Sequence, residues 1–154
     1  MMAKIHGKNT HFAVGNVSTD ALEDFSDFLN SIERSIERDL AESTGFKAAG
    51  GFKTYVAGLK DGSLSVSGQY EGGASGADAV LNALMDTDIA RSWEYGPEGD
   101  ASGTTRYSGG PNGGGAAGEG VLMSSYNLSS PLEDVVTFDA EFQITGAQIR
   151  GTFA

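Results

Sequence analysis

Acidic side chains occur in pairs that could, by residue type, serve as a general acid and a general base. Glu33 and Glu37 lie four residues apart, and Asp139 and Glu141 lie two apart. Such catalysis also needs a nucleophile, a histidine or another reactive group beside the carboxylates. Neither pair has one nearby in sequence, and both pairs are expected on exposed faces. The pattern therefore does not support an enzyme.

Three glycines, Gly113, Gly115 and Gly118, have the spacing of a dinucleotide-binding loop. Such a loop follows a strand and opens a helix, whose N-terminus meets the phosphates. Here Pro111 and Asn112 precede the glycines, and the segment after them is predicted to be a strand. We therefore reject a nucleotide site, and no cofactor is expected.

Metal-binding residue types are also scarce. His6 and His11 are the two histidines, and cysteine is absent. Two ligands do not close a metal site, so we interpret both histidines as surface or interface residues. Without cysteine there are no disulfides, no thiol catalysis and no cysteine-based zinc sites. Asp86 and Asp88 could bind a cation by type, but a solvated helix end is the simpler interpretation.

The charge balance narrows the possible partners. The chain has 154 residues, with 21 acidic against 10 basic residues and a formal net charge of −11. Such a surface does not neutralise phosphates, and it is repelled by anionic membranes. No apolar run reaches the roughly 18 residues of a membrane-spanning helix, and no signal peptide is expected. The sequence predicts a cytoplasmic protein that later joins something larger.

Alternation of apolar and polar residues predicts most of the secondary structure. A helix is predicted over 77–90, with an apolar stripe through Val80, Leu81 and Leu84. A short helical turn is predicted over 21–29, and Asp61-Gly62 is a typical hairpin turn. The predicted strands cover 11–17, 52–56, 63–70, 91–95, 121–128, 135–145 and 147–153.

Two segments are harder to interpret. In 31–41, Ile32, Ile36 and Leu40 recur every four residues, which favours a helix but also fits alternate positions of a strand. The glycine-rich stretch 96–120 has few apolar residues, so we expect a long loop outside the core. The sum is a mainly β (α+β) single domain over 1–154, of sandwich or barrel type with a flanking α-helix.

Several stretches together resemble one family. They are AKIHGKN at 3–9, ESTGF at 42–46, KTYVAGLKDGSLSVSG at 53–68, ADAVL at 77–81 and SSPLEDVVTF at 129–138. In order and spacing they are similar to the major tail proteins, or tail tube proteins, of long-tailed, siphovirus-type bacteriophages. The likeness spans nearly the whole chain.

The resemblance implies two packed β-sheets flanked by a helix, in a virion structural subunit. It implies hexameric rings that stack into a tube, with one sheet of each subunit joining a continuous barrel around the lumen. It also implies that 31–41 is a strand, against its helical periodicity. The implied partners are further copies of the chain, with tape measure, tail tip and tail terminator proteins, while DNA passes through the lumen without specific binding.

The resemblance gives the acidic residues a role, because an acidic lumen repels phosphates and lets DNA slide. It also suggests contact elements between rings: the N-terminal arm 1–10, the loop 44–51 and the glycine-rich loop 96–120. The lumen-facing candidates are Glu33, Glu37, Asp39, Asp139 and Glu141, and the contact candidates are Lys4, His6, Phe46, Lys47, Tyr107 and Asn112.

Two other classes of protein fit part of the pattern. A capsid decoration protein, or another virion structural protein, would also be β-rich and acidic, but it would not polymerise into long tubes. A sugar-binding module would need aromatic rings to stack on a sugar. Trp93 and a few tyrosines are present, but they form no cluster in the sequence.

Overall fold

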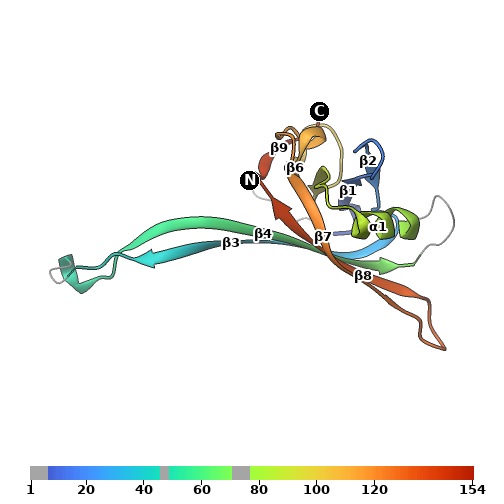
Figure 1. Cartoon of the computed structure of the whole chain (residues 1–154), viewed down its shortest axis with the longest axis horizontal. Helices are drawn as coiled ribbons and strands as arrows, with labels where there is room; N and C mark the ends of the chain where they lie inside the picture. Colours follow the sequence, from blue (N-terminus) through green and yellow to red (C-terminus); the bar gives the residue numbers. More distant parts are fainter. Residues whose placement is uncertain (1–6, 46–48, 71–76) are drawn as a thin grey trace.

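The computed structural model describes residues 7–45, 49–70 and 77–154. Over these residues, two antiparallel sheets are packed together with one α-helix beside them (Figure 1). The strand order is β2-β1-β5-β6-β9 in the five-stranded sheet and β3-β4-β8-β7 in the four-stranded sheet. The predicted mainly β fold of two sheets with a flanking helix is confirmed.

The five-stranded sheet brings together the N-terminal strand, the middle of the chain and the C-terminus. β1 lies between β2 and the central strand β5, and all five residues of β1 are buried. The strands of this sheet are β1 (His11–Gly15), β2 (Leu22–Asp24), β5 (Trp93–Gly96), β6 (Thr105–Gly109) and β9 (Ile149–Thr152).

The four-stranded sheet contains the longest strands. They are β3 (Leu29–Glu42), β4 (Tyr55–Gln69), β7 (Gly120–Ser129) and β8 (Thr137–Thr145). The segment 31–41 is therefore a strand, as the family resemblance implies and against its periodicity of four. The spacing of Ile32 and Ile36 places both on one face of β3, because residues two and four apart share a face of a strand.

β3 and β4 extend well beyond the rest of the molecule as a two-stranded arm (Figure 1). On β4, every residue from Tyr55 to Asp61 is exposed, whereas burial alternates from Gly62 to Gly68. The arm thus begins near Gly62, where the second sheet no longer covers the strands. Its tip holds the short 3-10 helix η2 (Ala49–Gly51), within the predicted contact loop 44–51.

The core lies between the two sheets and under the helix. Leu64, Val66, Phe138, Ala140 and Phe142 come from alternate positions of β4 and β8, as the strand pattern predicts. Burial of each large apolar side chain stabilises the fold by about 1.5–3 kcal/mol. Val121 of β7 belongs to the same sheet, and the opposing residues are Phe12, Val14, Phe25, Leu81, Leu84 and Trp93.

The helix α1 (Ala77–Asp86) packs beside β7. Leu81 and Leu84 are buried, and the hydroxyl of Tyr126 on β7 donates a hydrogen bond of 2.6 Å to Asp78. The predicted helix over 77–90 therefore exists but ends at Asp86. Ile89, beyond that end, is 61% exposed, so no apolar contact holds another turn.

The helical turn predicted over 21–29 is wrong. Residues 22–24 form β2, and Asp20 before it has a left-handed backbone with φ of 59°. The Asp20 carboxylate accepts hydrogen bonds from the backbone N–H and the hydroxyl of Ser92, at 2.8 and 2.6 Å. These bonds fix Asp20 outside the right-handed region that a helix needs.

The hairpin predicted at Asp61-Gly62 is also wrong, because β4 runs straight through both residues. Asp61 pairs with Glu37, and Gly62 pairs with Ile36 on one side and with Ile144 on the other. A Cβ on Gly62 would lie 2.6 Å from Cδ1 of Ile36. This glycine therefore makes room for neighbouring side chains instead of forming a turn.

The glycine-rich stretch 96–120 is not one loop outside the core. It contains β6 and the 3-10 helix η3 (Pro111–Gly113), and Ser108, Gly109 and Gly113 are buried. A Cβ on Gly109 would lie 2.5 Å from Nε1 of the fully buried Trp93. Glycine backbone thus packs on the indole, which a count of apolar residues cannot reveal.

Candidate functional site

The four-stranded sheet has one apolar face and one polar face. Because the strands pair in register, side chains lie in rows across the sheet. On the polar face, one row is Glu33, Ser65, Glu141 and Ser125, and the next is Ser31, Ser67, Asp139 and Asn127. The next row is Ser35, Ser63, Gln143 and Leu122. Beyond it, Glu37 pairs with Asp61, and Thr145 pairs with Gly120.

The structure brings four of the five lumen-facing candidates onto this polar face. Glu33 and Glu141 share a row, Asp139 lies in the next row, and Glu37 lies two rows away on the other side. All four side chains are exposed. Asp39 is also exposed and follows Glu37 along β3, beside a bulge in the pairing with β4.

Sequence reasoning missed Asp61, which lies directly opposite Glu37. The sequence Asp61-Gly62 is typical of a hairpin turn, so Asp61 was predicted to lie in a turn and not in a strand. The signal that could have found it is the alternation of Asp61, Ser63, Ser65 and Ser67, since all four share a face of one continuous strand. Gln143 donates hydrogen bonds to Asp61 and to the backbone oxygen of Gly62.

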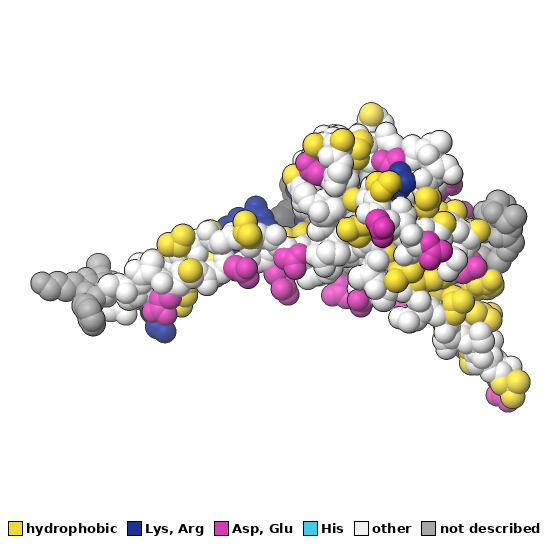
Figure 2. Space-filling view, in the orientation of Figure 1, with side chains coloured by type: hydrophobic (Ala, Val, Ile, Leu, Met, Phe, Trp, Pro, Cys, Tyr) yellow, Lys and Arg dark blue, Asp and Glu magenta, His cyan; other side chains and the backbone are white. Residues whose placement is uncertain are grey.

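The polar face is anionic, and its four rows contain no lysine or arginine. The small serines between the acids leave shallow hollows of about 360 and 100 Å³ over the sheet. The nearest cations of β3, Arg34 and Arg38, occupy the alternate positions that face the other way. Figure 2 shows this division where the arm leaves the body, with acidic side chains on the lower side and basic ones on the upper side; nearer the tip, a basic side chain also lies on the lower side.

The polar face has no feature of a catalytic centre. No histidine, nucleophile with an adjacent base, or buried carboxylate lies in its rows. Among the described residues, no group of three or more histidine, aspartate or glutamate side chains is arranged to hold a metal ion. What this surface can do is repel other anions along the length of the sheet.

The contact candidates are divided between described and undescribed parts of the chain. Tyr107 lies on β6, stacked on Tyr95 at 6.2 Å, with the Arg34 guanidinium 4.1 Å above its ring. Asn112 lies in η3; its backbone N–H donates to the Ser92 hydroxyl, and its side chain donates to the backbone oxygen of Asp20. Lys4, His6, Phe46 and Lys47 lie outside the described residues.

His11 is not a surface residue, because its side chain is buried at the start of β1. Its Nε2 lies 2.8 Å from Glu94, which also accepts a bond of 2.8 Å from Arg106. The bond to Glu94 raises the pKa of His11; Asp24 and Asp100 act in the same direction, and burial opposes them. The same bond, with help from Arg106, lowers the pKa of Glu94.

Among the described residues, the outer edge of β3 is free of partners, and the outer edge of β7 is free beyond Val121, which forms an isolated bridge with Arg91. The strand order ends with β3 on one side and β7 on the other, and each pairs with only one described neighbour. A free edge presents unpaired N–H and C=O groups, which favour pairing with another chain. The polar face and the two free edges together define a sheet suited to joining copies of itself.

Comparison with known proteins identifies the family to which the chain belongs. Residues 6–150 match the family model described as phage tail tube protein. The chain therefore belongs to the phage tail tube protein family, whose members are structural subunits of tail tubes. No curated protein sequence matches the chain at a significant level.

Solved structures share the fold at low sequence identity. A chain from the tail of an empty gene transfer agent particle, computed with C6 symmetry, aligns with a TM-score of 0.76 and 13% identity, covering 97% of this chain and 100% of that one. A chain of the SPP1 tail tube gives 0.66 and 13%, covering 98% and 81%. A chain of the sheath-tube complex of an extracellular contractile injection system gives 0.66 and 11%, covering 99% and 94%.

Proposed function

We propose that this chain polymerises into stacked hexameric rings, and that the polar face of the four-stranded sheet lines a lumen through which DNA passes. The observation that carries the proposal is the combination of an anionic face with two free edges on one sheet. The subunit performs no chemistry of its own in this role. The six-fold symmetry is supported by the similar gene transfer agent tail, which was computed with C6 symmetry.

The strand order supports closure into a ring. Each neighbouring pair in β3-β4-β8-β7 is antiparallel, so β3 and β7 at the two edges also run in opposite directions. When a copy is rotated about a ring axis, its β3 therefore meets β7 of the previous copy in an antiparallel sense. A continuous barrel can form without any change of strand direction, and closure removes the free edges.

The charge of the polar face supports passage of DNA without binding. A protein holds DNA mainly by placing lysine and arginine on phosphates and releasing counterions. Glu33, Glu37, Asp61, Asp139 and Glu141 repel phosphates instead, and no basic side chain occurs between them in these rows. The wall would therefore keep DNA away from its surface while the DNA moves.

Contacts between rings are assigned to the arm of β3 and β4 and to the N-terminal segment, of which residues 1–6 lie outside the described part of the chain. The arm of β3 and β4 ends in the loop 44–51, which includes Phe46 and Lys47, and the N-terminal arm 1–10 carries Lys4 and His6. Tyr107 and Asn112 make their contacts within the subunit, so β6 and η3 serve as support for such an interface. Head-to-tail contacts of this kind do not close, and they generate a filament.

The proposed tube also implies partner proteins and a location in the virion. Its end partners are tail tip and tail terminator proteins, and a tape measure protein occupies the lumen before DNA. The subunit is made in the host cytoplasm and ends in the tail of the virion. Over the described residues, no helix is long and apolar enough to cross a membrane.

Labelling of a single cysteine tests which face lines the lumen, because the chain has no cysteine of its own. Glu141→Cys places a thiol in the middle of the polar face, and Ser18→Cys places one on an exposed turn of the other sheet. Electron microscopy first establishes that each variant forms hollow tubes. In tubes, we expect Glu141→Cys to react with a small maleimide but to be protected from a bulky polyethylene-glycol maleimide.

Ser18→Cys should react with both reagents in tubes, and both variants should react with both as free subunits. Equal reaction of Glu141→Cys with the bulky reagent in tubes would show that the polar face lies outside. Failure of the unmodified protein to form tubes, alone or on a tail-tip complex, would remove the ring proposal itself.

A further inference from the structure

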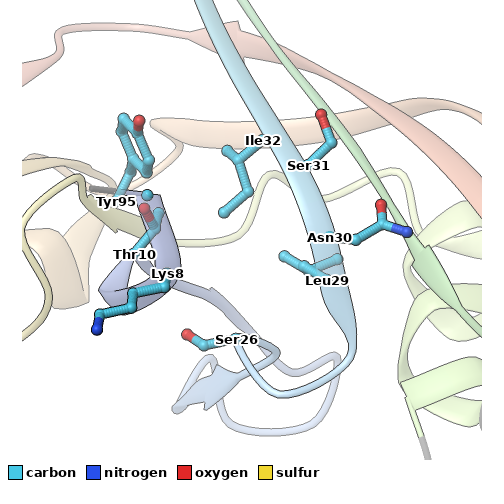
Figure 3. Close-up of a pocket in the computed structure, with 9 residues that line it drawn as sticks. Lys8, Thr10, Ser26, Leu29, Asn30, Ser31, Ile32 and Tyr95 are labelled. Carbon is cyan, nitrogen blue, oxygen red and sulfur yellow. The ribbon is translucent and has the colours of Figure 1, made fainter. Parts of the chain in front are cut away.

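A hollow of about 570 Å³ lies beside the free edge of β3, on the apolar side of the sheet (Figure 3). Leu29 and Ile32 on β3 form one wall, and Tyr95 on β5 faces them. The rest of the lining is polar, apart from Gly7, and consists of Lys8, Thr10, Ser26, Asn30 and Ser31. An apolar wall next to a free strand edge fits an apolar side chain carried by another strand that pairs with that edge.

The register of the sheet indicates which side chain this is. Leu29 pairs with Gly68, Gly68 pairs with Phe138, and Phe138 pairs with Leu128, so these four residues form one row. Leu128 stands at the opposite edge of the sheet, on the same face as Leu29. It is 51% exposed, and so the described part of its own subunit leaves about half of it uncovered.

In a ring whose joint keeps this register, the row continues from one copy to the next. Leu128 of one copy then lies beside Leu29 of the following copy, where the hollow begins. The hollow at Leu29 and the exposed Leu128 thus lie in the same row of the sheet, on the two edges that pair in the proposed ring.

We propose that Leu128 of one copy of this chain inserts into the hollow beside β3 of the next copy, and that this insertion fixes the register of the ring. The inference rests on the proposed ring and specifies its joint. The pairing of strand edges supplies hydrogen bonds along the joint but does not choose their register. A leucine that fits one hollow does choose it, since a slip would leave the leucine in water and the hollow empty.

A disulfide between copies tests the insertion directly. The double variant Leu29→Cys/Leu128→Cys should give covalent oligomers on mild oxidation of tubes, extending to a closed ring on a denaturing gel without reductant. The matched control is Leu29→Cys/Leu122→Cys, since Leu122 lies on the same strand but on the polar face, in the row of Gln143. It is separated from Leu128 by about 20 Å of strand at 3.3–3.4 Å per residue.

Cross-linking through Leu128 and not through Leu122 is the expected result. Tubes that form but do not cross-link through Leu128, or that cross-link through Leu122, would overturn the insertion and leave the ring intact. Absence of tubes for the unmodified protein would overturn the ring and the insertion together.

Assembly of point variants gives an independent test. Leu128→Asp should raise the concentration needed for tube formation roughly tenfold or more, because a buried leucine is lost at every joint. Leu128→Met keeps the volume and should assemble almost normally. The thermal unfolding of both free subunits should stay close to that of the parent, which separates assembly from folding. Normal assembly of Leu128→Asp would contradict the proposal.

Discussion

Asp20 shows how a single residue can join three distant parts of the chain. Its carboxylate accepts both hydrogen bonds from Ser92, and the Ser92 hydroxyl accepts a bond of 2.9 Å from the backbone N–H of Asn112. Ser92 is fully buried, so these groups have no water to replace a lost partner. A buried donor without an acceptor costs about 1–3 kcal/mol.

Asp20→Ala should therefore lower the free energy of unfolding by about 1–3 kcal/mol, because the N–H and hydroxyl of Ser92 lose their acceptor. The measurement is the urea midpoint of the free subunit at neutral pH. Asp27→Ala is the control. It removes an exposed carboxylate seven residues further along the chain and should change the urea midpoint little. Equal effects of the two substitutions would show that the bonds to Ser92 are not what matters.

His11 gives the subunit a predictable dependence on pH. Its pKa is raised above 6.5 by Glu94, so its contribution to stability is complete below that value and is lost as pH rises through the raised pKa. The pKa of Glu94 is lowered below 4.5, so its contribution is complete above that value and is lost as pH falls further. The pair stabilises the fold most between these two values.

Raising the pH from about 5.5 to about 8.5 should therefore lower the stability of the parent protein more than that of His11→Gln, which has no imidazole to titrate. Urea midpoints at the two pH values give this difference. His6 is present in both proteins, and so its titration cancels. A parent and variant with the same pH dependence would exclude His11 as the titrating group.

At the scale of elements, the start of the four-stranded sheet depends on close approach between β4 and the segment before β3. A Cβ on Gly68 would overlap the backbone oxygen of Phe28, and the backbone cannot move aside easily. A Cβ on Gly62 would meet only the ends of the Ile36 and Ile144 side chains, which can rotate. Gly62 and Gly68 thus differ in what a substitution must displace.

Gly68→Ala should destabilise the subunit by about 1–3 kcal/mol, as overpacking against fixed atoms does. Gly151→Ala on β9 is the control, because a Cβ there meets nothing within 4 Å. Thermal unfolding of the two variants under identical conditions makes the comparison. A Gly68→Ala protein as stable as the Gly151→Ala protein would mean that the chain before β3 can shift.

Strands with strict alternation could be predicted from the sequence, and the rest depended on contacts that the sequence does not display. β8 was predicted because Phe138, Ala140 and Phe142 alternate with polar residues. β6 was missed because Trp93 packs on glycine backbone, and a buried glycine looks like a loop residue in sequence. The length of β4 was missed because Asp61-Gly62 has the composition of a turn.

The candidate site was predictable in its parts but not in its arrangement. Alternation alone places Asp139 and Glu141 on one face, and the family resemblance placed Glu33 and Glu37 on a strand. That Glu33 and Glu141 share a row depends on β4 lying between β3 and β8, which no local pattern encodes. The hollow beside β3 was not predictable, because it is formed by side chains from distant strands.

Assembly of the whole molecule into a tube brings the acidic side chains of many subunits close together. The free subunit has a net charge of −11, and a tube would place the polar faces of many subunits around one axis. Repulsion between them opposes assembly at low ionic strength and is screened as salt is added. Tube formation should therefore require less protein at about 0.5 M salt than at about 0.05 M.

The double substitution Glu33→Gln/Glu141→Gln should weaken this salt dependence, because it removes charge from the polar face. Asp86→Asn/Asp88→Asn is matched in charge but lies at the end of α1, and it should leave the salt dependence closer to that of the parent. Sedimentation of tubes across a salt series gives the comparison. Equal effects of the two double variants would indicate that overall charge governs assembly, not the polar face.

The strand order has one more consequence, for the diameter of the tube. Because β3 and β7 run in opposite directions, a barrel of five, six or seven copies would have equally regular pairing at every joint. Hydrogen bonding between the edge strands therefore does not determine how many subunits form a ring. The number of subunits in a ring must instead depend on the angle between neighbouring subunits. The second sheet and the helix, which pack on the outer side of the barrel, set this angle. Changes in the core between the sheets are then expected to yield tubes of a different bore before they abolish tubes altogether.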